Sequence, residues 1–261
     1  MIEMEVESMA RRKKYFDIPG QMSFCFSVNS ENYVVEHNDL VNGHQSLSLQ
    51  AAKVVRTCIM QIRPDDKELH PYVISLNQLA GILNASKPSL VRDMDRICEE
   101  LTTHPVTVKE YDEKTQKVKC IRIPWVSLCA YSSGSGLAIK LNDELRPLLI
   151  QLSRNYVQYI LADVLTMKSV YAVRIYEMLL SRIQDRILPR DGVEIEIPVA
   201  DLRRATNTED KFERISNFKE KVIERAEAEI LRTTSYKVTH RDGKTGKRVT
   251  SLIFNVTMQY Y

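Results

Sequence analysis

The sequence predicts an α+β fold of two tandem winged-helix domains related by a pseudo-twofold internal repeat. Three blocks of sequence recur in the same order along the 261-residue chain. Each copy has the pattern of a helix, a short helix, a longer helix and two strands joined by a polar turn, which is the element order of a winged helix. Hydrophobic residues make up 44% of the chain and charged residues 27%, which is typical of a globular protein with a full core.

The first two repeated blocks predict the opening elements of each domain. Residues 48–63 align with residues 169–184 at an offset of 121, and both copies have the periodicity of an amphipathic helix. Residues 74–80 align with residues 197–203 at an offset of 123, and each is a short apolar step into a short helix. The growing offset indicates small insertions in loops, where length changes are tolerated.

The third repeated block predicts a hairpin at the end of each domain. Residues 101–118 align with residues 231–248 at an offset of 130 and share the pattern Asp-x-Lys-Thr-x-Lys. We interpret Asp112 to Lys119 and Asp242 to Arg248 as the wings, because flexible cations on a hairpin turn can reach phosphates. The strands are predicted at Val106 to Glu110, Val118 to Ile123, Tyr236 to His240 and Thr250 to Met258.

The repeat also sets the expected domain boundaries. We predict an N-terminal extension at residues 1–35, a first winged-helix domain at 36–141, a linker helix region at 142–168 and a second winged-helix domain at 169–261.

Positive charge is concentrated in the second half of the repeat. The net charge is only +3, but residues 1–168 hold 20 Lys and Arg against 20 Asp and Glu, whereas residues 169–261 hold 17 against 14. Within Ile230 to Arg248 there are six basic residues and one acid. A local basic patch of this kind favours a nucleic-acid partner more than the total charge does.

The third helix of the second domain is the candidate reader of DNA. We expect it to follow Thr208 to Asp210 and to bury Ile215, Phe218, Val222, Ala226 and Ile230, which turns Arg214, Asn217 and Lys221 outward with Arg225 at the edge. Arg and Asn can hydrogen-bond base edges in the major groove, and Lys suits phosphate. A charged helix face is also common on proteins that bind no DNA. The predicted DNA-binding residues of this domain are Arg214, Asn217, Lys219, Lys221, Arg225, Lys244, Lys247 and Arg248.

The matching helix of the first domain predicts a weaker contact. It begins after Ser86 with Pro88 in its first turn, and residues 86–101 carry three basic residues against four acids, which repel phosphate. This helix is equally suited to contact protein, so this domain could be the dimerising half. Its candidate DNA-binding residues are Lys87, Ser89, Arg92 and Arg96, with Lys114 and Lys117 in the following turn.

No catalytic, metal or cofactor site is predicted. The five histidines are scattered, and no Gly-x-x-x-x-Gly-Lys loop occurs. The five cysteines include no Cys-x-x-Cys pair, and we interpret them as small apolar residues in a reducing compartment. No apolar run approaches the roughly 18 residues of a membrane helix. We therefore expect a cytoplasmic protein that is not an enzyme, with no cofactor, no metal and no membrane partner.

Two motifs carry a family resemblance. The segments Tyr156-Val-Gln-Tyr159-Ile-Leu and Ser169-Val-Tyr-Ala-Val-Arg174-Ile-Tyr-Glu177-Met-Leu resemble the iteron-binding replication initiator family of bacterial plasmids, and the match spans roughly residues 36–258. The resemblance implies binding of double-stranded DNA at directly repeated origin sequences (iterons), melting of the origin, and recruitment of the host initiator and helicase. It also implies a monomer that initiates replication and a dimer that represses its own gene at an inverted repeat.

Two other functions fit the same fold. One is a winged-helix transcriptional regulator without an initiation role. The other is a winged-helix scaffold for protein interactions, which would bind DNA weakly and without dependence on Arg214, Asn217 or Lys221.

Overall fold

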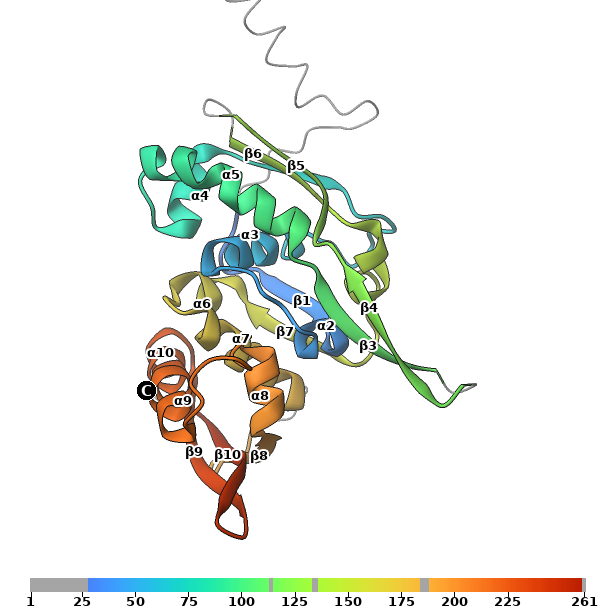
Figure 1. Cartoon of the computed structure of the whole chain (residues 1–261). Coiled ribbons are helices and arrows are strands. Elements are labelled where there is room, and N and C mark those ends of the chain that lie inside the picture. The colour runs from blue at the N-terminus through green and yellow to red at the C-terminus, as the bar shows by residue number, and fades with distance from the viewer. Residues whose placement is uncertain (1–27, 113–114, 133–135, 184–187, 260–261) are drawn as a thin grey trace, which may run out of the picture.

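The computed structural model describes residues 28–112, 115–132, 136–183 and 188–259 of the chain. Two similar units lie one above the other, joined along a narrower middle (Figure 1). We refer to residues 49–141 as the N-terminal unit and to residues 170–258 as the C-terminal unit. Most of the predicted N-terminal extension, together with Lys114 and Cys25, lies outside the described residues.

The N-terminal unit is a winged helix whose helices begin at well-formed caps. Its elements are α3 (Leu49–Ile59), β2 (Pro71–Ile74), α4 (Leu76–Leu83), α5 (Lys87–Thr103), β5 (Val126–Ser132) and β6 (Gly136–Leu141). Ser75 and Gln78 form a capping box at the start of α4, and the Ser86 hydroxyl accepts from the Ser89 amide at the start of α5. The antiparallel sheet has the strand order β2-β6-β5.

The C-terminal unit repeats this arrangement. Its elements are α7 (Val170–Ile183), β8 (Val193–Pro198), α8 (Val199–Ala205), α9 (Ile215–Phe218), the π-helical turn η2 (Lys219–Ile223), α10 (Glu224–Thr233), β9 (Tyr236–Thr245) and β10 (Arg248–Met258). The strand order β8-β10-β9 is that of β2-β6-β5 in the N-terminal unit. The prediction of two tandem winged helices is therefore confirmed.

The strand order corrects the predicted first wing. The hairpin of β3 (Val106–Asp112) and β4 (Lys117–Ile123) forms as predicted, but it pairs with neither β2 nor β6. The strands equivalent to β9 and β10 are instead β5 and β6, whose turn lies outside the described residues. The hairpin β3–β4 is thus an insertion, and its alignment with the second wing was wrong. The shared Asp-x-Lys-Thr-x-Lys pattern reflects local turn chemistry, whereas pairing across the sheet decides which hairpin is the wing.

The predicted linker helix region is also different. Residues 142–168 contain a 3-10 helix η1 (Asp143–Leu148), the strand β7 (Tyr156–Ile160) and the short helix α6 (Leu161–Thr166). Asn155 has a positive φ of 55° directly before β7, so the backbone turns here and no single helix can run through the region. The domain boundaries themselves stay a prediction.

The repeat has a further block before the first aligned one, which the sequence comparison did not detect. It lies at the middle of the molecule. β1 (Tyr33–His37) leads into the short helix α2 (Asn38–Asn42), as β7 leads into α6. β1 and β7 start 123 residues apart and pair antiparallel, and the pair at their centre, Val35 with Gln158, is also 123 residues apart. Equivalent strands that pair at equivalent residues lie about a local twofold axis. The two units are therefore arranged with pseudo-twofold symmetry, and β1–β7 lies on the axis (Figure 1).

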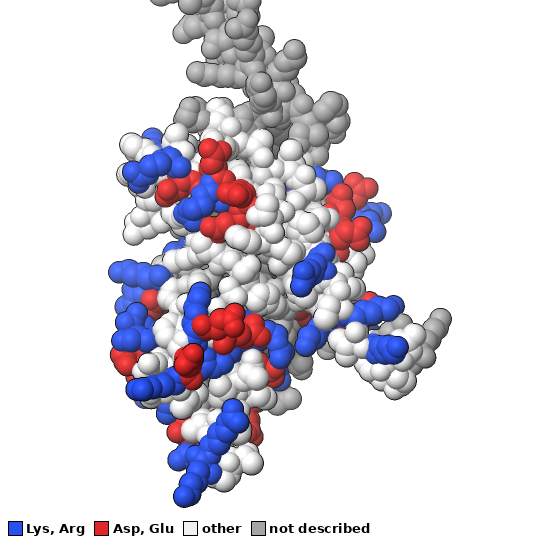
Figure 2. Space-filling model, in the orientation of Figure 1, with Lys and Arg blue, Asp and Glu red and all other residues white. Residues whose placement is uncertain are grey.

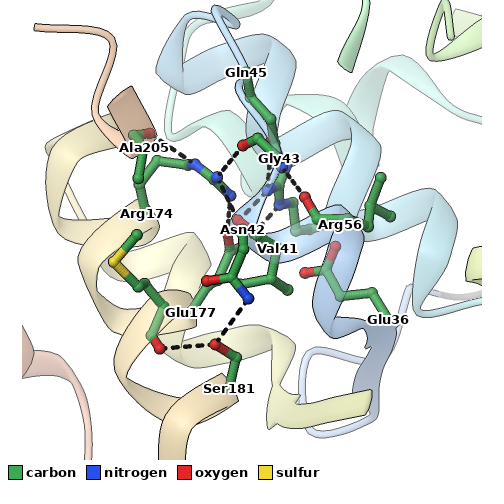
Figure 3. Close-up of polar contacts among 12 residues, drawn as sticks. Glu36, Val41, Asn42, Gly43, Gln45, Arg56, Arg174, Glu177, Ser181 and Ala205 are labelled. Carbon is green, nitrogen blue, oxygen red and sulfur yellow. Dashed lines mark hydrogen bonds and ion pairs between the residues drawn. The ribbon is translucent and has the colours of Figure 1, made fainter. Parts of the chain in front are cut away.

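A buried ion pair joins the two units beside this axis. Arg56 of α3 and Glu177 of α7 occupy equivalent positions of the repeat, 121 residues apart. The guanidinium donates two hydrogen bonds of 2.9 Å to the two carboxylate oxygens, and neither side chain is exposed (Figure 3). Gln45 accepts a third hydrogen bond from Arg56, and the indole of Trp125 lies 5.5 Å from the guanidinium carbon. This bidentate geometry compensates for the loss of water around both charges.

Two further cations tie each unit to the other. Arg174 of α7 donates to Glu177, to the carbonyls of Val41 and Gly43 at the end of α2, and to the Ala205 carbonyl (Figure 3). At the equivalent position of α3, Lys53 donates to the Leu165 carbonyl near the end of α6, at 2.6 Å. Each first helix therefore sends a cation to the short helix of the other copy, where carbonyl groups carry partial negative charge.

A neutral carboxyl group completes the junction. The hydroxyl of Tyr159 lies 2.7 Å from Glu177 Oε1 and 2.9 Å from Glu36 Oε1. A phenol has one proton, so a proton on Glu36 is needed to make both hydrogen bonds. Burial, and then repulsion by Glu177, raises the pKa of Glu36 from 4.5 to about 7. Burial alone would also raise the pKa of Glu177, but Arg56 and Arg174 outweigh it and lower that pKa. Glu177 is thus the ionised partner and Glu36 the neutral one.

Glu177→Gln is expected to destabilise the protein by about 3–5 kcal/mol, because it leaves two buried guanidinium groups without their carboxylate. Equilibrium urea unfolding measures the loss. Glu194→Gln is the matched control, since Glu194 pairs with Arg241 on an exposed surface and its loss should cost less than about 1 kcal/mol. Equal losses in the two variants would show that the junction is not held by its buried charges.

The raised pKa of Glu36 predicts that the free energy of unfolding depends on pH. Between pH 4.5 and about 7 the unfolded chain ionises Glu36 and the folded protein does not, so this group lowers the free energy of unfolding as pH rises through that window. The decrease is about 2–4 kcal/mol and is complete above pH 7. Glu36→Gln should remove this component, so unfolding of the variant from pH 4.5 to 8 should show the shallower decline. Parallel pH profiles for the two proteins would contradict the assignment.

Candidate nucleic-acid interface

The turn before the third helix of the C-terminal unit is organised by Arg203. The chain leaves α8 at Ala205 and starts α9 at Ile215, so the helix begins four residues later than Lys211, the first residue after the predicted start signal at Thr208 to Asp210. Phe212 has a positive φ of 54°, which a bulky side chain rarely adopts. The Arg203 guanidinium holds this turn by donating to four carbonyls, those of Thr208, Lys211, Phe212 and Glu213. It also lies 4.5 Å from the ring centre of Phe218, directly beneath the helix.

The helix that follows presents the predicted side chains outward. Arg214, Asn217 and Arg225 are exposed, and Lys221 is half-buried. Residues 215–233 form one continuous helix with the π-helical turn η2 in its middle. In an α-helix a spacing of four residues drifts by about 40° per step, and the wider π turn offsets this drift. Arg214, Asn217, Lys221 and Arg225, which are spaced three or four residues apart, therefore stay on one face of the helix.

The buried side of this helix is close to the prediction. Phe218, Val222, Ala226 and Ile230 are buried, whereas Ile215 is half-buried at the helix start. Ile223 is also fully buried, because the π turn directs two consecutive residues into the core.

Three acids interleave with the predicted cations. Glu213 is exposed directly before the helix, Glu220 and Glu224 are exposed on it, and Glu220 lies 2.5 Å from the Lys221 ammonium group. The helix face is therefore close to electrically neutral. A face of this kind selects by hydrogen bonding to base edges more than by attraction to phosphate, since carboxylates can accept from cytosine and repel phosphate.

The hairpin β9–β10 is fixed to this helix by an ion pair and a hydrogen bond. Lys219 donates to Asp242 of β9 at 2.8 Å, and His240 of β9 lies 2.8 Å from Glu227 of α10. Gly243 allows β9 to pass close to its neighbour, because a Cβ atom there would collide with the Ser251 hydroxyl. Lys219, a predicted DNA contact, is thus occupied in positioning the hairpin, and its contact with DNA stays a prediction.

The excess positive charge lies at the tip of this hairpin. Lys244, Lys247 and Arg248 are exposed and have no ion pair among the described residues. Figure 2 shows Lys and Arg side chains at this tip and along the side of the C-terminal unit where α9 and α10 lie. Gly246 has a φ of 62° in the turn, which places Lys247 at the extreme end of the ribbon. The helix and the hairpin tip together form the candidate interface.

The N-terminal unit offers fewer free cations. Arg96 of α5 is held by Glu100 and Gln50, and Arg92 lies beside Ser89 and Asp93. Lys87 is exposed at the start of the helix, and Val91 is 36% exposed. Over α5 acidic and basic side chains are mixed (Figure 2). The charges of α5 favour the weaker DNA contact that the sequence predicts for it. That contact stays a prediction.

The remaining candidates of this unit are separated from α5. Lys117 is exposed at the start of β4, on the inserted hairpin instead of on the wing. Lys114 lies outside the described residues. The structure therefore brings Lys87, Ser89, Arg92 and Arg96 together on one helix and places Lys117 on another element.

Two residues of the interface were missed in the sequence. Ser216 is exposed in the first turn of α9, between Arg214 and Asn217, and its position depended on knowing where the helix begins. Arg203 lies in the last turn of the short helix α8 and looked like an ordinary surface cation, because its four carbonyl partners come from a turn whose path has no sequence signal. An Arg directly before a polar turn and a recognition helix is the pattern that could have indicated it.

Known proteins share both sequence and fold with this chain. Residues 33–180 match the family model "Initiator Replication protein, WH1", and residues 198–256 match "Initiator Rep protein, WH2". An Escherichia coli replication initiation protein is 23% identical over 172 residues, which cover 64% of this chain and 52% of that protein. The chain thus spans about half the length of this relative. An uncharacterised 27.6 kDa protein of Escherichia coli is 23% identical over 164 residues, covering 58% of this chain and 67% of that one.

One solved structure has the same fold. The crystal structure of Pi initiator protein in complex with iteron DNA matches with a TM-score of 0.71 and 18% identity, over 88% of this chain and 99% of that one. No helix in the described part of the chain is long and apolar enough to cross a membrane.

Arg203→Ala is expected to loosen the turn before the third helix. The variant loses four carbonyl contacts and the aromatic contact, at a cost of about 2 kcal/mol, and the strained backbone at Phe212 loses its support. Hydrogen exchange of residues 206–218 should accelerate at least tenfold. Arg204→Ala is the control, because Arg204 makes one half-exposed ion pair with Asp201 in the same helix. Equal protection of the turn in both variants would exclude the role given to Arg203.

Proposed function

Because the chain belongs to the Initiator Replication protein family, we propose that it initiates plasmid replication by binding directly repeated sequences, iterons, in double-stranded origin DNA. The observation that carries the proposal is the rigid pairing of a near-neutral helix with a cationic hairpin tip in one unit. The helix would enter the major groove with Arg214, Ser216 and Asn217 at its leading end, and the hairpin would hold the adjacent backbone.

The side chains of the helix and of the hairpin support contacts with different parts of the DNA. Arg214 can bond guanine and Asn217 can bond adenine with two hydrogen bonds each, which supports sequence reading by the helix. Lys244, Lys247 and Arg248 extend from the hairpin as exposed cations with no ion pair in the part of the chain that the structure describes, which supports phosphate or minor-groove contact. Lys221 and Arg225, further along the helix, would reach phosphates at the edge of the groove.

The pseudo-twofold arrangement supports direct repeats as the target. A symmetric homodimer places two identical helices on an inverted repeat. Here the two helices of one chain differ, because α5 shows Lys87, Ser89 and Arg92 where the C-terminal unit shows Arg214, Asn217 and Lys221. One chain would therefore read two different half-sites. An asymmetric site of this kind can recur head to tail, and each copy would accept one chain.

Further partners rest on family membership. We propose that a dimer of the chain represses its own gene at an inverted repeat, and that the chain recruits the host replication initiator and helicase. The proposed role requires binding and no catalysis. The Escherichia coli replication initiation protein is longer than this chain, so these activities are proposed for the chain.

The first test is footprinting of the protein on the DNA that flanks its own gene. The double variant Arg214→Ala, Lys221→Ala should lose protection, because both side chains lie on the groove-facing side of the helix. Arg241→Ala is the control, since this exposed cation pairs with Glu194 away from the helix. Regularly spaced direct repeats would support the initiator. Protection of an inverted repeat alone, with no direct repeats protected, would indicate a transcriptional regulator without an initiation role. No protection by the unmodified protein would contradict DNA binding altogether.

Affinity measurements separate the helix from the hairpin. Arg214→Ala should weaken binding by about 1–3 kcal/mol and relax the preference at one base pair. Lys247→Ala should weaken binding to all sequences and reduce the slope of log affinity against log salt by about 1. Titrations from 50 to 200 mM salt with matched and mismatched duplexes measure both effects. An unchanged salt slope in Lys247→Ala would remove the hairpin from the interface.

A further inference from the structure

A pair of thiols lies between the third helix and the sheet of the N-terminal unit. Cys98 is on α5 and Cys129 is on β5, and the thiol of Cys129 donates a hydrogen bond to the sulfur of Cys98. A hydrogen bond beside the two thiols holds α5 and β5 in this alignment. Asp95, one helical turn before Cys98, accepts a 2.6 Å hydrogen bond from Tyr131, two residues after Cys129 on the same face of the strand.

The two cysteines are accessible, in contrast to the third cysteine nearby. Cys98 and Cys129 are half-buried, whereas Cys58 is fully buried. Burial raises the pKa of Cys58, which keeps that thiol protonated and unreactive. Cys120 is exposed on β4, on the separate hairpin.

From this geometry we propose that Cys98 and Cys129 form a modification site, at which a peroxide converts the two thiols into an intramolecular disulfide that ties α5 to β5. The Cys98 thiolate attacks one peroxide oxygen, which forms a sulfenic acid and releases hydroxide. The Cys129 sulfur then attacks the sulfenic sulfur, the new S–S bond forms and water leaves. In sum two thiols and one hydrogen peroxide give one disulfide and two waters.

The surroundings assign the two steps to different residues. The hydrogen bond from Cys129 lowers the pKa of Cys98 more than burial and the neighbouring Asp95 raise it. The same hydrogen bond, with burial, raises the pKa of Cys129. Cys98 is therefore the sulfur that reacts with peroxide, and Cys129 is the sulfur that resolves the sulfenic acid.

Peptide mapping tests the proposal on the full chain carrying Cys25→Ser and Cys120→Ser, which prevents crosslinks through those two cysteines. After treatment with hydrogen peroxide and alkylation, non-reducing tryptic digestion should join the fragments 97–109 and 123–140, and dithiothreitol should separate them. The closed loop should raise the Tm by roughly 5 °C or more. A Cys58 to Cys129 link, or no link between the two fragments, would overturn the proposal.

Single variants separate the two roles. In Cys129→Ser the serine hydroxyl can still donate to Cys98, so peroxide should leave a sulfenic acid on Cys98 that dimedone traps. In Cys98→Ser the Cys129 thiol should stay unmodified at the same peroxide dose. Thermal unfolding of both reduced variants shows that they are folded. The assigned order would be contradicted if Cys129 in Cys98→Ser reacted with peroxide as fast as Cys98 does in Cys129→Ser.

Discussion

The arrangement of the two units depends on the buried pair of Arg56 and Glu177. These positions are equivalent in the internal repeat and lie beside a local twofold axis. In a dimer of identical chains, equivalent positions near the axis carry the same residue, and two like charges there would repel. Within one chain the two copies can differ, so one position holds a guanidinium and the other a carboxylate. Arg174, Lys53 and the neutral Glu36 then satisfy the charges and carbonyls around this pair.

The two copies of the repeat also differ in the side chains that they present on the surface. The junction holds the two third helices on one framework, and their outward side chains differ. The helix α5 presents Lys87, Ser89 and Arg92, whereas the third helix of the C-terminal unit presents Arg214, Asn217 and Lys221. In the C-terminal unit the third helix is positioned from two sides, by Arg203 in the last turn of α8 before it and by the contacts of Lys219 and Glu227 with Asp242 and His240 of the hairpin after it. Rigid support of this kind allows a few side chains to discriminate bases, because each hydrogen bond depends on placement to a fraction of an ångström.

Much of the candidate site was predictable because helix periodicity is local. The outward positions of Arg214, Asn217 and Arg225, and the cations of the second hairpin, follow from apolar spacing and turn residues. The role of Lys219 was not predictable, because Asp242 becomes its neighbour only when β9 folds back on the helix. The start of α9 was displaced for a similar reason, since the turn is stabilised by Arg203 and by no capping side chain at Arg214.

The sequence by itself determined the two winged helices, the caps of α4 and α5, and the motif in α7 that contains Arg174 and Glu177. Each of these depends on residues within one or two turns of each other. Only the tertiary structure decided that β5–β6 is the first wing, that β1 and β7 open the two copies of the repeat, and that Arg56 meets Glu177. These features join residues far apart in the chain, and strand order and buried charge pairing are fixed by long-range contacts that leave no periodic signal in the sequence.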